Sequence, residues 1–245
     1  MAAPRFHSLD PLSPGLAGRT IELRESVAHH ALRVLRLAVG DALTLFDGTG
    51  GEYATRLVHA DKRGAAVRVE CFVAAERESD LEVALALGIA SNDAMDHALR
   101  KATELGVTSI QPLVTERSSP LPSGDRAEKR LAHWRHVAIA ACEQCGRNRV
   151  PEVLSPRPLR DWLGGWHGSG IVFLPDADRS LATLEQPPAP LALLIGPAGG
   201  FDSQEEAAIR AKPFSAVRLG PRVLRTETAA MAGLALLQSR WGDWQ

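Results

Sequence analysis

The stretch "LLIGPAGGFDSQEE", residues 193–206, is the part of the sequence that most directly indicates the fold of this chain. The apolar run "LALLI" at 191–195 ends in Gly196-Pro197, two more glycines follow, and "DSQEE" then begins like a helix. A strand, a glycine-rich loop and a helix in succession indicate a ligand site at the loop. The spacing matches neither the dinucleotide-binding fingerprint nor the phosphate-binding P-loop, so the ligand has to be inferred from the rest of the chain.

Residues 81–245 on either side of this stretch alternate apolar runs with helical patterns. We expect strands at 81–90, 109–114, 170–175, 191–197 and 215–220, and helices at 93–107, 126–146, 202–211 and 227–241. Such alternation predicts an α/β domain with a parallel sheet covered by helices on both faces. Ligands of such sheets bind beyond the carboxyl ends of the strands.

Residues 1–73 have a different pattern, with short alternating strand-like runs broken by glycine turns. One segment, 25–41, is helical in pattern, with Val27, Ala31, Val34 and Leu35 at helical spacing. A single helix among short strands predicts a small β-barrel. The polar stretch at 74–80 is the expected linker between the two domains.

Composition favours a soluble globular protein that acts in the cytoplasm. Hydrophobic residues make up 45% and charged residues 23% of the 245 residues, and no apolar run reaches the ~18 residues that span a bilayer. The N-terminal residues lack the apolar core of a secretory signal, so no membrane association is expected. A net charge of -1 gives no overall attraction to nucleic acid, so any RNA contact has to come from local arginine clusters.

The three cysteines do not form a disulfide framework. Cys142 and Cys145 have the spacing of a redox or zinc pair, but no second pair and no suitably spaced histidines accompany them. We therefore expect them to pack inside a helix and expect no metal site.

Three strand ends are the candidate walls of a pocket: "FLPDAD" after Phe173, "IGPAGGF" after Ile195 and "LGPRVLRTETA" after Leu219. Their apolar residues and glycines would admit a flat ligand such as an adenine ring. The absence of lysine from all three loops argues against a nucleoside triphosphate.

Several segments of the sequence, taken together in their order along the chain, indicate a family. "LLIGPAGGFDSQEE" and "LGPRVLRTETAAMAGL", preceded by "PRFH", "HHALRVLRLAVGD", "LFDGTGGEY", "KATELGVTSIQPLVTERS" and "EQCGRNRVP", resemble the bacterial 16S ribosomal RNA (uracil-N3)-methyltransferases across nearly the whole chain. These enzymes are SPOUT-class RNA methyltransferases that use S-adenosylmethionine.

The resemblance implies a PUA-like β-barrel that binds RNA at 1–73, a linker at 74–80, and a SPOUT α/β domain with a trefoil knot at 81–245. It also implies a homodimer that methylates N3 of uridine 1498 of 16S ribosomal RNA in the small ribosomal subunit. The residues expected to bind the cofactor are Leu174, Pro175, Ile195, Gly196, Gly199, Gly200, Leu219, Gly220 and Leu224.

Catalysis has to stabilise the negative charge that develops on the uracil as N3 loses its proton. Arg222 and Arg225 are our candidates, because a guanidinium stays charged. Glu227 is the candidate to orient an arginine or accept the proton through water, unless it and a capping Thr226 only stabilise a helix start. The candidate RNA-binding residues are Arg5, Arg33, Arg36, Arg147, Asn148 and Arg149.

One residue departs from the family pattern: Ala198 stands where the loop usually has glutamate. We expect this change to be tolerated, because Gly196, Gly199 and Gly200 are present. The alternatives are a SPOUT methyltransferase for a different RNA, such as tRNA or large-subunit RNA, and a non-catalytic RNA-binding or assembly factor, which Ala198 alone supports.

Overall fold

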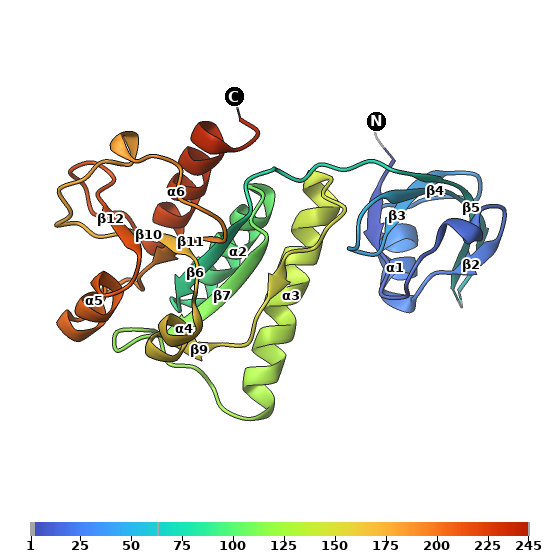
Figure 1. Ribbon diagram of the computed structural model, residues 1–245. Helices are drawn as coiled ribbons and strands as arrows, with labels where there is room; N and C mark the ends of the chain where they lie inside the picture. The colour runs from blue at the N-terminus through green and yellow to red at the C-terminus, as the bar shows by residue number, and fades with distance from the viewer. Residues whose placement is uncertain (1–2, 63, 245) are drawn as a thin grey trace. The chain divides into compact units, whose positions relative to one another are not determined.

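A computed structural model describes residues 3–62 and 64–244 of the chain, which fold as two compact units (Figure 1). The N-terminal unit comprises residues up to Glu78 together with Cys142–Val150, and the C-terminal unit comprises Ser79–Ala141 and the residues from Pro151 onward. The sequence analysis assigned 142–150 to the C-terminal domain, and here the structure differs.

The N-terminal unit is built on a five-stranded sheet in the order β1-β3-β4-β5-β2. Its strands are β1 (Arg5–His7), β2 (Thr20–Glu22), β3 (Ala42–Phe46), β4 (Glu52–Ala60) and β5 (Ala65–Val73), with a 3-10 turn, η1, at Pro14–Leu16. β1 pairs with β3 in parallel, and the other pairs are antiparallel. Tyr53, Thr55 and Leu57 alternate inward along β4 and are buried, as the period of a strand requires.

The helical segment of this unit is short and changes its pitch. α1 (Glu25–His29) continues as a π-helical turn, η2 (His30–Val34), in which the Leu35 N–H donates to the carbonyl of His30 at 3.0 Å. Ala31 is buried, whereas Val34 and Leu35, which share its helical spacing in the sequence, are exposed. The wider turn adds a residue to the helical repeat and rotates both side chains away from the core.

The C-terminal unit has a parallel sheet in the order β12-β10-β11-β6-β7-β8, with β9 also paired to β7. The strands are β6 (Val83–Gly88), β7 (Ser109–Val114), β8 (Glu152–Val153), β9 (Arg157–Pro158), β10 (Ser169–Phe173), β11 (Leu191–Ile195) and β12 (Phe214–Val217). The predicted parallel sheet is thus confirmed. β11 lies in its middle and all five of its residues are buried, which explains its unbroken apolar sequence.

Helices cover both faces of this sheet (Figure 1). They are α2 (Asn92–Glu104), α3 (Asp125–Cys145), α4 (Leu159–Gly165), α5 (Ser203–Arg210) and α6 (Thr226–Trp241), with a 3-10 turn, η3, at Leu181–Thr183. Ala192 and Leu194 of β11 join the core cluster under α4 and α5, whereas Leu193 points to the opposite face and packs at Gly233 of α6. Alternation along one buried strand therefore separates the two helical layers.

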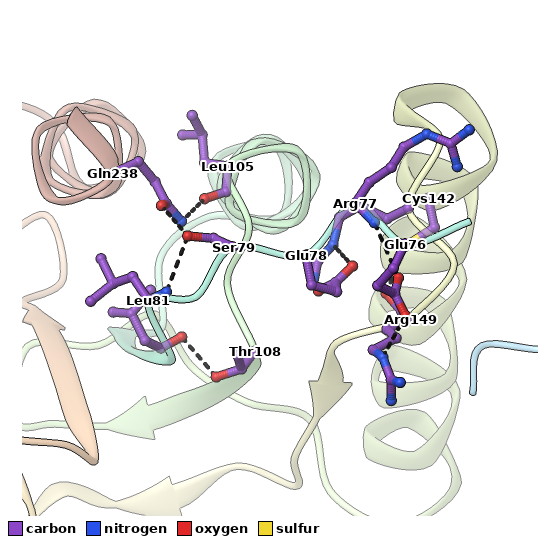
Figure 2. A network of polar contacts seen from close by, with 12 residues as sticks. Glu76, Arg77, Glu78, Ser79, Leu81, Leu105, Thr108, Cys142, Arg149 and Gln238 are labelled. Atoms are coloured by element: carbon purple, nitrogen blue, oxygen red, sulfur yellow. Dashed lines mark hydrogen bonds and ion pairs between the residues drawn. The ribbon is translucent and has the colours of Figure 1, made fainter. Parts of the chain in front are cut away.

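The buried side chain of Gln238 ties the end of α2, the start of α6's final turn and the entry to β6 together (Figure 2). Its Nε2 donates to the carbonyl of Leu105 at 3.0 Å, and its Oε1 accepts from the hydroxyl of Ser79 at 2.7 Å. Ser79 Oγ in turn accepts from the N–H of Leu81. A single amide thus satisfies polar groups from two other segments.

Gln238→Leu should lower the free energy of unfolding of the C-terminal unit by about 2 kcal/mol, because partners of the amide lose their hydrogen bonds inside the protein. Urea unfolding followed by tryptophan fluorescence measures this change. Ser239→Ala, at the exposed neighbouring position, is the matched control and should leave the midpoint unchanged. An unchanged midpoint in Gln238→Leu would contradict the role given to the amide.

Candidate cofactor and RNA-binding sites

A cavity of about 100 Å³ lies at the carboxyl ends of β10 and β12. Its walls are formed by the residues after each strand and by the first turns of α6: Phe173, Leu174, Pro175, Arg218, Leu219, Gly220, Pro221, Arg222, Val223, Leu224 and Ala229. Two of the three predicted strand ends therefore meet around one space. The position at the carboxyl edge is where parallel sheets bind their ligands.

The predicted residues divide into two groups at this cavity. Leu174, Pro175, Leu219, Gly220 and Leu224 line it, together with the catalytic candidate Arg222. Ile195 is buried in the sheet, and Ile195, Gly196, Gly199 and Gly200 do not line the cavity. The lining residues that the sequence analysis did not assign are Phe173, Arg218, Pro221, Val223 and Ala229, and all but Ala229 are adjacent to predicted residues.

The glycine loop after β11 forms a tight turn against the end of β6. The Gly200 N–H donates to the carbonyl of Pro197 at 2.9 Å, and Gly200 has a φ of 70°, which favours glycine. A Cβ on Gly88 would lie 2.8 Å from the carbonyl carbon of Gly196, so only glycine at 88 admits the loop this closely. Ala198 is exposed on the turn, and none of these contacts depends on its side chain.

The segment after β7 braces the glycine loop from outside. Nη1 of Arg117 donates to the carbonyls of Gly199 at 2.9 Å and Phe201 at 3.2 Å. The buried carboxylate of Glu205 accepts from the N–H of Glu116 and from that of Asp202, both at 2.9 Å. Asp202 caps α5 in return by accepting from the Glu205 N–H at 2.7 Å, which makes a capping box.

Thr226 joins the glycine loop to the start of α6, because its hydroxyl donates to the carbonyl of Gly196 at 3.2 Å. The N-cap of α6 is Arg225, without a side-chain capping bond, so Thr226 is not the cap that the sequence suggested. Arg225 is exposed and Glu227 is half-buried in the first turn of the helix. The three catalytic candidates thus occupy one short segment between the cavity and the helix N-terminus.

A second hollow, of about 480 Å³, adjoins the last loop. It shares Arg218, Leu219, Gly220, Arg222 and Leu224 with the first cavity and is completed by residues of η3 and α6. Arg240 at its edge donates to the carbonyls of Ala182 at 3.1 Å and Leu184 at 2.8 Å and so holds η3 to α6. The loop from Arg218 to Leu224 therefore separates two concave surfaces.

Two predicted RNA-binding residues, Arg147 and Asn148, are buried in the N-terminal unit. The guanidinium of Arg147 makes a two-point ion pair with Glu78, with Nε to Oε1 at 2.9 Å. Burial alone would lower the pKa of Arg147, but its hydrogen bonds and charge interaction with Glu78 outweigh burial and raise that pKa. Asn148 donates to the carbonyl of Ala75 and accepts from Arg5 at 2.6 Å, so this placement argues against direct RNA contact by either residue.

The remaining arginine candidates differ in exposure. Arg5 is paired with Glu52 and has a side chain that is 14% exposed, whereas Arg149 is exposed and pairs with Glu76 at 2.9 Å (Figure 2). Burial would raise the pKa of Glu52, but hydrogen bonds from Arg5 and Arg77 outweigh it and lower that pKa. Arg33 and Arg36 are exposed and have no ion pair within the described residues.

Burial raises the pKa of the Cys142 thiol to about 12, so this thiol is neutral at physiological pH. Its Sγ donates to the carbonyl of Arg149 at 3.6 Å, which is a packing role as expected. Within residues 3–62 and 64–244, no group of three or more metal-binding side chains is close enough to hold an ion. No helix in this part of the chain is long and apolar enough to cross a membrane.

Comparison with known proteins agrees with this geometry. Residues 77–238 match the model of an RNA methyltransferase domain, and residues 23–70 match that of an RNA methyltransferase PUA domain. The ribosomal RNA small subunit methyltransferase E of Buchnera aphidicola (subspecies Schizaphis graminum) is 32% identical over 227 residues, covering 92% of each chain.

Two similar solved structures carry S-adenosylmethionine. One is the ribosomal RNA small subunit methyltransferase E of Neisseria gonorrhoeae, with a TM-score of 0.91, 37% identity and full coverage of both chains. The other is a putative methyltransferase of Legionella pneumophila, with a TM-score of 0.93 and 34% identity over 99% of this chain and 100% of that one. The chain therefore belongs to the family of PUA-containing RNA methyltransferases that includes the ribosomal RNA small subunit methyltransferases E.

Proposed function

We propose that this protein transfers a methyl group from S-adenosylmethionine to N3 of one uridine, position 1498 in the usual numbering, of 16S ribosomal RNA. The observation that carries the proposal is the cavity at the carboxyl edge of the sheet, with Arg222 in its wall and Arg225 at the adjoining start of α6. The names of the relatives support ribosomal RNA of the small subunit as the substrate.

The cavity fits the adenine end of the cofactor. Leu174, Leu219 and Leu224 provide apolar walls, and the loops between them expose backbone groups that can pair with the edge of a base. A volume of about 100 Å³ suits one ring system, so the rest of the cofactor would lie along the open glycine loop. There Gly199 is exposed and presents main chain without a side chain.

The residues at the start of α6 suit the chemistry at uracil N3. S-Adenosylmethionine, when bound, supplies the methyl group already activated as a sulfonium. The protein has to hold the base in line and stabilise negative charge on N3, O2 and O4. Arg222 and Arg225 would supply that stabilisation without a metal ion, helped by the positive end of the α6 dipole, and Glu227 would orient an arginine or accept the proton through water.

The finer features implied by the family complete the proposal. The chain of the C-terminal unit would form the trefoil knot, and the protein would act in the cytoplasm as a homodimer. Val223 in the last loop is 81% exposed and Leu236 of α6 is 43% exposed, which supports cover by a second copy. The N-terminal PUA-like domain would grip the RNA through Arg33 and Arg36, with the target base turned out of its stack.

Two alternatives remain distinct from this proposal: methylation of another RNA, and an RNA-binding factor without catalysis. The second rests on Ala198, whose exposure on the turn weakens it, because the bonds that shape the loop are made by backbone and by Arg117. A large gain of methylation in Ala198→Glu would show that the missing carboxylate matters.

Mass-spectrometric mapping of 16S ribosomal RNA from cells with and without the protein tests the function. We expect one uridine to gain 14 mass units, about the mass of a CH₂ group, and to stop reverse transcription, because N3 methylation blocks the pairing edge of the base. Purified protein and S-adenosylmethionine should restore the mark. A mark restored only on another RNA, or none despite cofactor binding, would select one of the alternatives.

Arg225→Ala should lower kcat for methylation by about 10²-fold to 10³-fold, because it removes a charge that acts mainly in the transition state. The dissociation constant for S-adenosylmethionine, measured by calorimetry, should change less than about twofold. Arg160→Ala, an exposed arginine that contacts Gln204 on α5, is the control and should change neither value. A lost cofactor affinity in Arg225→Ala would instead place Arg225 in the cofactor site.

Arg117→Ala should weaken S-adenosylmethionine binding by about fivefold, because the glycine loop loses two hydrogen bonds worth together about 1 kcal/mol. Arg117→Lys should recover part of the affinity, since an ammonium can donate to both carbonyls. Arg135→Ala removes a similar bond, from Nε to the carbonyl of Val153, away from the loop and serves as control. Equal effects of Arg117→Ala and Arg135→Ala would indicate a general loss of stability.

A further inference from the structure

The π-helical turn of the N-terminal unit creates an exposed strip, which we define as Arg33, Val34, Leu35, Arg36 and Val39. The side chains of Val34 and Val39 are 59% and 60% exposed, and that of Leu35 is 43% exposed. Three large, exposed aliphatic side chains within seven residues of the chain favour an interaction site.

The backbone conformation of the π-helical turn exposes these residues. Leu32 and Leu37 pack against the core of the unit in their place. The hydrogen bond from the Leu35 N–H to the carbonyl of His30 and that from the Leu37 N–H to the carbonyl of Ala31, both 3.0 Å, widen the turn. A regular α-helix would have kept Val34 and Leu35 on the face of Val27 and Ala31, so the π turn is what presents them to solvent.

The strip also contains a strained residue. Arg36 has a φ of 56°, and within the described residues it is the one non-glycine residue with a positive φ. Such a conformation costs of order 1 kcal/mol or more and persists where the surroundings hold it. Glycine at this position would remove the strain, so an arginine here indicates that its side chain is used.

The positive charge of the strip favours a negatively charged partner. Residues 33–39 contain two arginines and no acidic residue, and neither Arg33 nor Arg36 has an ion pair in the described part of the chain. Arg33 also lines a hollow of about 680 Å³ with His29 and Leu32, opposite Lys62 in the β4–β5 turn. Glu25 and Asp61 line the same hollow, and the carboxylate of Asp41 accepts a hydrogen bond from the N–H of Ala38 at 2.8 Å.

We propose that this strip docks on unpaired nucleotides of the RNA substrate, with the arginines on phosphates and the aliphatic side chains against exposed base faces. Guanidinium groups recognise phosphate oxygens, and bases outside a helix offer apolar faces that need cover. The inference rests on the proposed function, since it takes small-subunit ribosomal RNA as the ligand.

The test uses the full-length protein and a protein-free fragment of 16S ribosomal RNA that carries the proposed target. The double variant Val34→Ser with Leu35→Ser should raise the dissociation constant about tenfold without changing its salt dependence. Arg33→Gln with Arg36→Gln should also weaken binding and should make the slope of log K against log salt shallower by about 1 to 2. Urea midpoint and S-adenosylmethionine affinity should stay unchanged in both.

The variant Arg36→Gly distinguishes the backbone strain at this position from the contribution of the guanidinium to RNA binding. It should raise the urea midpoint, because glycine adopts a positive φ freely, and should weaken RNA binding, because the guanidinium is lost. Val58→Ser, at an aliphatic residue of β4 that is 40% exposed, is the matched control for the serine variants and should bind RNA as the parent does.

Unchanged RNA affinity in the serine variants would overturn the docking surface and leave the proposed function intact. Loss of methylation on assembled small subunits, with normal binding to protein-free RNA, would also overturn it and assign the strip to a ribosomal protein. If the parent protein neither binds nor methylates small-subunit RNA, the proposed function itself fails.

Discussion

The site depends on how closely the chain after β11 approaches the end of β6. Glycine at 88 permits that approach, since any Cβ there would meet the Gly196 backbone. Once the loop is seated, Thr226 can reach the Gly196 carbonyl and bring the start of α6 to the same edge. Arg117 and Glu205 then hold the loop from outside. Backbone packing therefore brings the start of α6, whose Ala229 lines the cavity, to the carboxyl edge of the sheet.

The arginines proposed for RNA binding in the N-terminal unit differ in burial and therefore in role. Arg147 neutralises Glu78 inside the unit, and Arg5 bonds Asn148 and Glu52. The Arg147–Glu78 ion pair and the Arg5–Asn148 hydrogen bond join residues 142–150 to the rest of the unit, and removing one member of the buried ion pair would leave an uncompensated charge. Among the arginines that the sequence suggested for RNA binding, Arg33 and Arg36 are exposed and have no ion pair in the described part of the chain. A cluster of arginines in a sequence does not reveal this division, because the acidic partners of Arg5 and Arg147 lie 47 and 69 residues away in the chain.

The sequence predicted the elements with strong periodicity and missed those that tertiary contacts create. β6, β7, β10, β11 and β12 and the helices α2, α3, α5 and α6 were all expected, because each buries a continuous run or one face. β1, β8, β9 and α4 were missed, being three, two, two and seven residues long. The π turn was missed because hydrogen-bond register, which sequence periodicity does not contain, decides whether Val34 faces the core or solvent.

The glycine loop shows that a motif can identify a family without lining the cavity beside it. Its glycines were expected to line the cavity, yet Gly196 packs against the ring of Phe201, where a Cβ would lie 3.2 Å from the ring, and Gly200 has a positive φ. These two glycines shape the turn, while the cavity walls come from the loops after β10 and β12. Ala198 fits this division: it occupies the exposed corner of a turn that backbone bonds already define. A carboxylate at that corner would matter through what it meets in the bound state, and the shape of the loop would be the same without it.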